Sequence, residues 1–168
     1  KEFKIEKGFM TTIHSYTTDQ RLLDNSHKDP RRARSAGQSI VPTSTGASKT
    51  LEEIIPELKG KIEGLAIRVP TPNVSLVDLV FNSQNKLSVK KINDSFIKAS
   101  NKELKNILAT TSEKLVSVDF NHNSNSAIVD LSLTNVVGNN MGKVSAWYDN
   151  EWGFASRVND LVEYIHKI

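Results

Sequence analysis

Cysteine is absent from the 168 residues of this chain. Its absence excludes disulfide bonds, thiolate metal sites and a cysteine nucleophile supplied by these residues. The sequence has no run of 18 apolar residues, which a membrane-crossing helix needs, and no stretch near its start is typical of a signal peptide. We therefore expect a cytoplasmic protein without a membrane partner and without a metal site.

Positive charge exceeds negative charge only slightly. The 22 Lys and Arg residues face 19 Asp and Glu residues, and the densest positive stretch, residues 28–34, contains Arg31, Arg32 and Arg34. A nucleic-acid-binding protein usually gathers more positive charge on one face. A solvated or interface-forming loop is the plainer interpretation, and recognition of a small phosphate is the next. No specific nucleic-acid partner is expected.

The length suits one domain with a substantial core. The chain opens on Lys1 rather than Met, in a polar stretch that is typical of the end of a helix. We therefore interpret residues 1–168 as one domain of a longer protein.

Alternation of apolar and polar residues and the positions of Pro and Gly divide the chain into elements. They predict strands at residues 8–17, 63–69, 74–81, 115–120, 127–133 and 143–148. They predict helices at residues 47–55, from a Ser88 cap onward, at 102–108 and near the C-terminus, with turns at 42–46 and 138–140 and a long loop at 18–41. Hairpin-like strand pairs without βαβ alternation indicate an α+β fold: a mixed, largely antiparallel sheet with helices on one face.

Three places could carry chemistry. His14 ends a predicted strand among several hydroxyls, residues 43–46 place hydroxyls at a predicted helix start, and Arg68 lies in an otherwise apolar strand. Each has a plainer interpretation: a structural histidine, an ordinary helix cap and a structural salt bridge. Taken together they suggest an enzyme acting on a phosphate ester, because free amides at a helix start and a guanidinium both bind anions.

Five blocks carry a family resemblance, in the same order and spacing as in that family. They are residues 10–20 (MTTIHSYTTDQ), 31–34 (RRAR), 42–47 (PTSTGA), 68–75 (RVPTPNVS) and 147–153 (WYDNEWG). From about Gly8 to the C-terminus the chain resembles the catalytic, C-terminal domain of phosphorylating glyceraldehyde-3-phosphate dehydrogenase. That resemblance implies attack of a cysteine thiolate on an aldehyde, hydride transfer to NAD or NADP, and cleavage of the thioester by phosphate.

The resemblance also implies roles for individual residues. His14 matches the histidine that raises the thiolate fraction and acts as acid and base, and Tyr148 matches an aromatic residue beside it. Thr17 and Arg68 match the groups that hold the phosphate of the substrate. Asn150 matches the amide that binds the nicotinamide carboxamide.

A second phosphate site and an assembly are implied in the same way. Thr45 and Gly46 match the pocket for inorganic phosphate, with Arg32 close by. Residues 17–41 match an S-shaped loop that lines the cofactor site of a neighbouring subunit in a homotetramer.

Several features depart from the family. The Ser-Cys-Thr-Thr-Asn motif and the glycine fingerprint of a dinucleotide-binding domain are absent. We therefore predict that the chain by itself is inactive and binds no cofactor tightly. Asn25-Ser26 replaces the Leu-Pro of strict NAD users, so the choice between NAD and NADP is open; Pro30 and Gly37 are local departures.

Two alternatives remain open. Erythrose-4-phosphate dehydrogenase is a close relative with a four-carbon substrate, and a non-catalytic RNA- or protein-binding module would explain the missing nucleophile. We also expect the apolar stripe of the C-terminal helix, which includes Leu161 and Ile165, to be poorly covered and to promote association.

Overall fold

Eight strands join in one sheet in the computed structural model, which describes residues 2–168 apart from the side chain of Ser48. The strands are β1 (Ile5–Ser15), β2 (Val41–Ser44), β3 (Ile62–Val69), β4 (Ser75–Ser83), β5 (Leu108–Thr111), β6 (Ala127–Asp130), β7 (Asn135–Val137) and β8 (Met141–Tyr148). The helices are α1 (Ala47–Ile54), α2 (Val89–Asn101) and α3 (Trp152–His166), with 3-10 turns η1 (Pro56–Leu58) and η2 (Ser117–Phe120).

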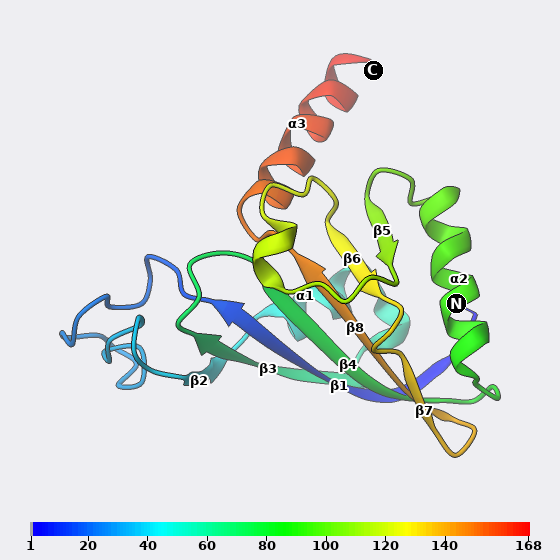
Figure 1. The fold of residues 1–168 in the computed structure, drawn as a ribbon, viewed down its shortest axis with the longest axis horizontal. Coiled ribbons are helices and arrows are strands. Elements are labelled where there is room, and N and C mark those ends of the chain that lie inside the picture. The colour runs from blue at the N-terminus through cyan, green and yellow to red at the C-terminus, as the bar shows by residue number, and fades with distance from the viewer. Residues whose placement is uncertain (1) are drawn as a thin grey trace.

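The strand order is β2-β3-β1-β4-β8-β6-β5, and β7 pairs with β8 (Figure 1). Only β1 with β3 and β5 with β6 run parallel; the other neighbours are antiparallel. The predicted α+β class with a mixed, largely antiparallel sheet is therefore confirmed. The longest strands, β1 and β4, lie in the middle, so the candidate residues at their ends are held by partners on both sides.

Two apolar clusters hold α2 and η2 to the sheet. In the first, Ile92 of α2 packs with Phe81 and Leu87, and the helix begins where the Ser88 hydroxyl accepts a hydrogen bond from the backbone N–H of Lys91 at 3.2 Å. In the second, Phe120 of η2 packs with Val74, Ile128 and Trp147, and the Phe120 and Trp147 rings stack 5.4 Å apart. The predicted Ser88 cap is confirmed.

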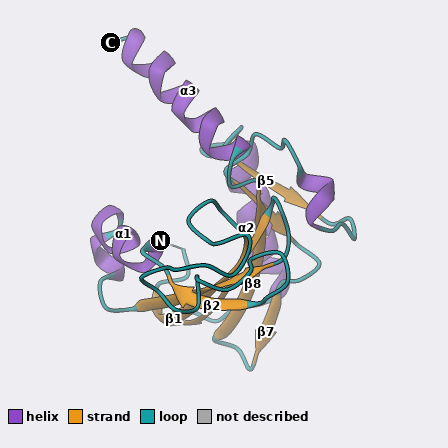
Figure 2. Ribbon diagram, turned by 90° about the vertical axis from the view of Figure 1, so that its left-hand side faces the viewer, coloured by secondary structure: helices purple, strands orange, loops and turns teal. Residues whose placement is uncertain are grey.

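The C-terminal helix α3 does not lie on the sheet. It projects away from the strands in both views (Figures 1 and 2). Phe154 is 71 % exposed, Leu161 56 % and Ile165 58 %. The prediction of helices packed on one face is therefore wrong for α3, whereas the prediction that Leu161 and Ile165 are poorly covered is confirmed. None of the helices within residues 2–168 combines the length and apolarity needed to cross a membrane.

Two predicted elements near the middle of the chain are wrong. Residues 102–108 form turns rather than a helix, because Asn106 has a left-handed backbone (φ 66°) and Leu108 already opens β5. Residues 115–120 form a loop and η2 rather than a strand. The Asp119 carboxylate accepts a hydrogen bond from the N–H of Val116 at 2.8 Å, which closes a capped turn that an alternating pattern does not reveal.

Three strands were missed: β2, β5 and β7. The segment predicted as a turn at 42–46 overlaps β2, in which Pro42 pairs with Ile67 on an edge of the sheet, where a missing N–H is tolerated. The short strand β7 forms a hairpin with β8 around Gly138, whose positive φ of 62° explains the predicted turn there.

Candidate active site

The strand register brings the main candidate residues onto one face of the sheet. His14 of β1 pairs directly with Arg68 of β3, and directly paired residues point to the same side. The registers of β1 with β4 and of β4 with β8 place Tyr148 on that side as well. The His14 and Tyr148 rings meet edge to face with centroids 6.1 Å apart. Residues distant in sequence thus converge at one end of the central strands.

The imidazole of His14 is oriented by its neighbours. Its Nδ1 lies 2.6 Å from the carbonyl oxygen of Ser15. Since a carbonyl oxygen only accepts, this contact is a hydrogen bond when Nδ1 carries the proton. The lone pair of the neutral ring is then on Nε2. Nη1 of Arg68, 2.9 Å from the same Nδ1, is in that case a close positive charge rather than a second hydrogen-bond partner.

These surroundings keep the ring neutral at physiological pH. Burial lowers the pKa of His14 below its ordinary value of 6.5, the positive charge of Arg68 lowers it further, and the Ser15 carbonyl and Glu151 oppose the shift. A neutral imidazole with Nε2 free can accept a proton. The site therefore contains a side chain that can accept a proton.

We expect the NMR titration midpoint of His14 to lie below 6.5, because burial and the Arg68 charge both disfavour the imidazolium. In Arg68→Gln the midpoint should rise toward 6.5, since one of the two causes is removed. Arg34→Gln, which removes an exposed guanidinium paired with Asp24, should leave it unchanged. An unchanged midpoint in Arg68→Gln would contradict the close approach of the Arg68 guanidinium to the His14 ring.

Arg68 has a hydrogen-bond donor without a partner among residues 2–168. Its Nη1 donates to the carbonyl oxygen of Ser15 at 3.0 Å and to Oγ1 of Thr17 at 3.3 Å. Its Nε is buried without a hydrogen-bond partner among residues 2–168, and no ion pair joins Arg68 to a carboxylate within that part of the chain. Burial lowers the pKa of Arg68. A half-buried guanidinium is costly without a charged partner, and the structural salt bridge expected as the plainer interpretation does not occur within residues 2–168.

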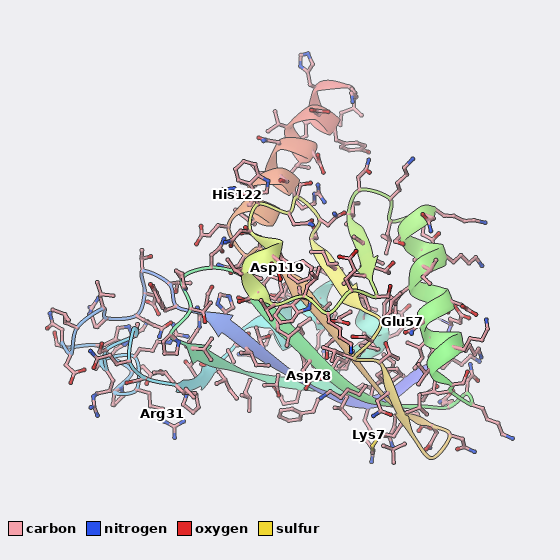
Figure 3. The ribbon with its side chains drawn as sticks, viewed as in Figure 1. Lys7, Arg31, Glu57, Asp78, Asp119 and His122 are labelled. Carbon is pink, nitrogen blue, oxygen red and sulfur yellow. The ribbon has the colours of Figure 1, made fainter. Side chains whose placement is uncertain are left out.

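Arg32 has a different environment. It forms an ion pair with Asp19 and lies 3.8 Å from a carboxylate oxygen of Asp29. Its Nε donates to Oγ1 of Thr43 at 3.0 Å. Its charge is thus balanced by carboxylates, and the residue braces the long loop at 16–40 against β2. The residue labelled Arg31 in Figure 3 belongs to this loop.

Thr45 and Gly46 form the start of α1. Oγ1 of Thr45 accepts a hydrogen bond from the N–H of Ala47 at 3.2 Å, and Gly46 is the capping residue without a side-chain bond. Within residues 2–168 no hydrogen bond joins either residue to His14, Arg68 or Arg32. The structure thus places them at a helix start, as expected, but in a group separate from His14 and Arg68.

Asn150 is held by two serines that the sequence analysis did not single out. The hydroxyls of Ser15 and Ser75 donate to Oδ1 of Asn150 at 2.9 and 3.1 Å. Ser75 opens β4 and belongs to the block at 68–75, so its position after the Pro-Thr-Pro turn was the available signal. With Oδ1 occupied, the amino group of Asn150 is the part that can meet a ligand.

Asp149 is a second residue that sequence reasoning missed. It is 2 % exposed, and its carboxylate accepts four hydrogen bonds: from Nδ2 of Asn73 and the N–H groups of His122, Glu151 and Trp152, at 2.8 to 3.0 Å. His122 lies at the foot of α3, where its ring meets Trp152 with centroids 4.8 Å apart (Figure 3). Asp149 thus ties two loops and the start of α3 to the site.

A cavity of about 360 Å³ lies beside these groups. Its lining residues are His14, Ser126, Tyr148, Asp149, Asn150, Gly153, Phe154 and Arg157. Burial raises the pKa of Tyr148, so its phenol is protonated here. The cavity therefore brings a base, a phenol and a carboxamide together, whereas the residues of 2–168 include no cluster of three His, Asp or Glu that could hold a metal ion.

The family model and the relatives that match this chain all belong to one protein family. The family model for the glyceraldehyde-3-phosphate dehydrogenase C-terminal domain matches residues 1–150. The chain is 56 % identical over 166 residues to the chloroplastic glyceraldehyde-3-phosphate dehydrogenase B of Pisum sativum, which covers 98 % of this chain and 37 % of the relative. It is 50 % identical over 165 residues to glyceraldehyde-3-phosphate dehydrogenase 2 of Bacillus subtilis, covering 98 % and 48 %.

The chain thus spans less than half the length of these curated relatives. The match covers the segments that carry His14, Arg68, Tyr148 and Asn150, and it agrees with the α+β architecture and with the resemblance found in the sequence. The chain belongs to the glyceraldehyde-3-phosphate dehydrogenase family and corresponds to its C-terminal domain.

Proposed function

We propose that this chain is the catalytic part of an enzyme that oxidises and phosphorylates D-glyceraldehyde 3-phosphate with NAD or NADP. The observation that carries the proposal is the pairing of His14, a neutral base, with Arg68, a guanidinium with spare donors, on one face of the sheet. A base beside an anion site suits an aldehyde that carries a phosphate.

His14 and Arg68 have complementary tasks in this reaction. A thiolate from outside residues 1–168 adds to the aldehyde carbon, and the resulting alkoxide takes a proton from solvent to become the hemithioacetal hydroxyl. Nε2 of His14 then takes that proton as the hydride leaves the same carbon. Arg68, with Thr17, holds the phosphate of the substrate through paired N–H donors. The 6.1 Å contact with Tyr148 restrains the His14 ring.

The residues also fit a nicotinamide cofactor. When bound, the cofactor accepts the hydride that leaves the aldehyde carbon. Asn150 suits this group because Oδ1 is held by Ser15 and Ser75, which leaves an amino group to donate to the carboxamide oxygen of the ring. Asn25-Ser26 in the 16–40 loop is the place where we expect the choice between NAD and NADP to be made.

Inorganic phosphate is assigned to Thr45 and Gly46, with Arg32 nearby. The support is the start of α1, whose capping residue Gly46 offers no side chain to the helix, because the N-terminal end of a helix favours an anion. Because Arg32 forms an ion pair with Asp19, its charge contributes only secondarily to the binding of inorganic phosphate.

We further propose that the full-length protein is a cytoplasmic homotetramer. The support for assembly is the loop at 16–40, which extends from the edge of the sheet in Figure 1, and the half-exposed apolar residues on the sheet face opposite His14, such as Phe9 (48 % exposed). The relatives include a chloroplastic and a bacterial protein, so the compartment needs its own measurement, by fractionation of cells that make the full-length protein.

A hybrid enzyme tests the proposed function: this chain joined to the N-terminal part of the Bacillus subtilis relative. We expect the hybrid to reduce NAD or NADP when given D-glyceraldehyde 3-phosphate and phosphate, and the chain alone to be inactive because it contains no cysteine. Turnover of erythrose 4-phosphate alone would support the alternative dehydrogenase. A folded hybrid without turnover on either aldehyde would overturn the proposal in favour of a binding role.

A further inference from the structure

A buried network of hydroxyls surrounds the oxygen of Asn150. Ser15 is 0 % exposed and Ser75 1 % exposed. Ser15 ends β1 and Ser75 begins β4, so two adjacent strands deliver one hydroxyl each to the same carboxamide. Both hydroxyls donate to Oδ1 of Asn150, at 2.9 and 3.1 Å.

Each of the two serines directs its hydroxyl proton to Asn150. The backbone N–H of Ser15 donates to Oγ of Ser75 at 3.1 Å, so Ser75 accepts from one strand while its own proton goes to Asn150. A hydroxyl has one proton to give, and each serine gives it to Oδ1. The amino group of Asn150 donates no hydrogen bond within residues 2–168.

We propose that Ser15 and Ser75 are positioning residues, which hold the carboxamide of Asn150 with its oxygen inward and its amino group free for the carbonyl oxygen of a ligand carboxamide. The ligand part of this inference rests on the proposed function, in which that carboxamide belongs to nicotinamide. The positioning part rests only on the geometry of the chain.

Burial makes this arrangement effective. Because both serines are buried, solvent does not compete for their hydroxyl protons, and two bonds from different strands fix the rotation of the amide, which one bond would leave free. The neighbouring Asp149 anchors the backbone through the N–H groups of Glu151 and Trp152. The side chain and the main chain of Asn150 are therefore restrained independently.

The first test is the mobility of the Asn150 amino group in this chain, measured by NMR relaxation of its Nδ2 and assigned by the loss of the signal in Asn150→Asp. We expect an order parameter of about 0.85, typical of rigid groups, that falls below about 0.6 in the Ser15→Ala/Ser75→Ala double variant. Ser145→Ala, which removes another buried hydroxyl on β8, should leave it unchanged. An unchanged value in the double variant overturns the positioning role.

The second test is the dissociation constant for NAD in the hybrid enzyme. We expect it to rise about 10-fold in the double Ala variant, whereas Ser75→Thr, which keeps a hydroxyl, should retain most of the binding. A lower order parameter without weaker binding would overturn the ligand part. If the unmodified hybrid binds no NAD, the proposed function fails, and the NMR result still decides the positioning role.

Discussion

Asparagine in place of His14 is expected to lower the kcat of the hybrid enzyme by about 10² to 10⁴-fold, the usual contribution of a positioned general base. The amide is similar in size to the imidazole but cannot take a proton at neutral pH. Since Arg68 and Thr17 are untouched, the KM for the aldehyde phosphate should change little. The measurement is the initial rate of cofactor reduction at saturating substrate.

The matched control is His166→Asn at the end of α3, where the side chain is exposed. Its kcat should stay within about 2-fold of the unmodified hybrid, because surface substitutions have small effects. Equal losses in both variants would indicate that damage to folding, rather than the loss of a base, explains the His14 result. A His14→Asn enzyme with unchanged kcat would contradict the proposed role.

Asparagine in place of Asp149 is expected to lower the free energy of unfolding by about 3 kcal/mol, since four donors converge on a buried carboxylate and an amide group would place a donor among them. The backbone around these donors is strained: Val74, next to Asn73, has φ 64°, and His122 has φ 61°. The bonds to Asp149 offset that strain. Urea unfolding followed by circular dichroism measures the loss.

The difference in the free energy of unfolding between the unmodified chain and Asp149→Asn should become smaller as the pH falls. Burial tends to raise the pKa of Asp149, but the hydrogen bonds from Trp152, His122, Asn73 and Glu151 outweigh it and hold the pKa below 3.8. The folded state thus favours the carboxylate, so its stabilisation is complete above the unfolded pKa and is lost as the pH falls through the folded pKa.

The control for this prediction is Asp160→Asn, which removes the ion pair that the exposed Asp160 carboxylate forms with Arg157 at 2.7 Å. It should cost less than about 1 kcal/mol, as exposed pairs do. If Asp149→Asn costs no more than Asp160→Asn at neutral pH, the network around Asp149 contributes little to stability and the structural argument is wrong.

Much of the fold was predictable because its central elements have strong local patterns. The alternation in 8–17 predicted β1 apart from its first residues, and Ser88 with the spacing of Ile92 and Phe96 predicted α2. The errors fall where a single backbone conformation decides the outcome. The left-handed φ of Asn106 interrupts a stretch of good helix formers; Asn favours this conformation, but one Asn among helix formers is a weak signal in the sequence.

The candidate site was predictable to a different degree. Family blocks identified His14, Arg68 and Asn150, and the register of β1 with β3 explains how the first two meet. Ser15, Ser75 and Asp149 were missed because a serine or an aspartate beside a turn is an ordinary turn former in sequence. Their functions depend on hydrogen bonds that span 60 to 135 residues or converge on one buried carboxylate, which no local pattern encodes.

The direct pairing of His14 with Arg68 also determines which length changes the gene can tolerate. Insertion of one codon between Gly8 and His14 would reverse the side of the sheet to which every later side chain of β1 points, because strand side chains alternate. His14 and Arg68 would then face opposite ways, whereas the same codon added within the irregular 16–40 loop would lengthen only a connection. Natural length variation in this domain should therefore concentrate in that loop and avoid β1.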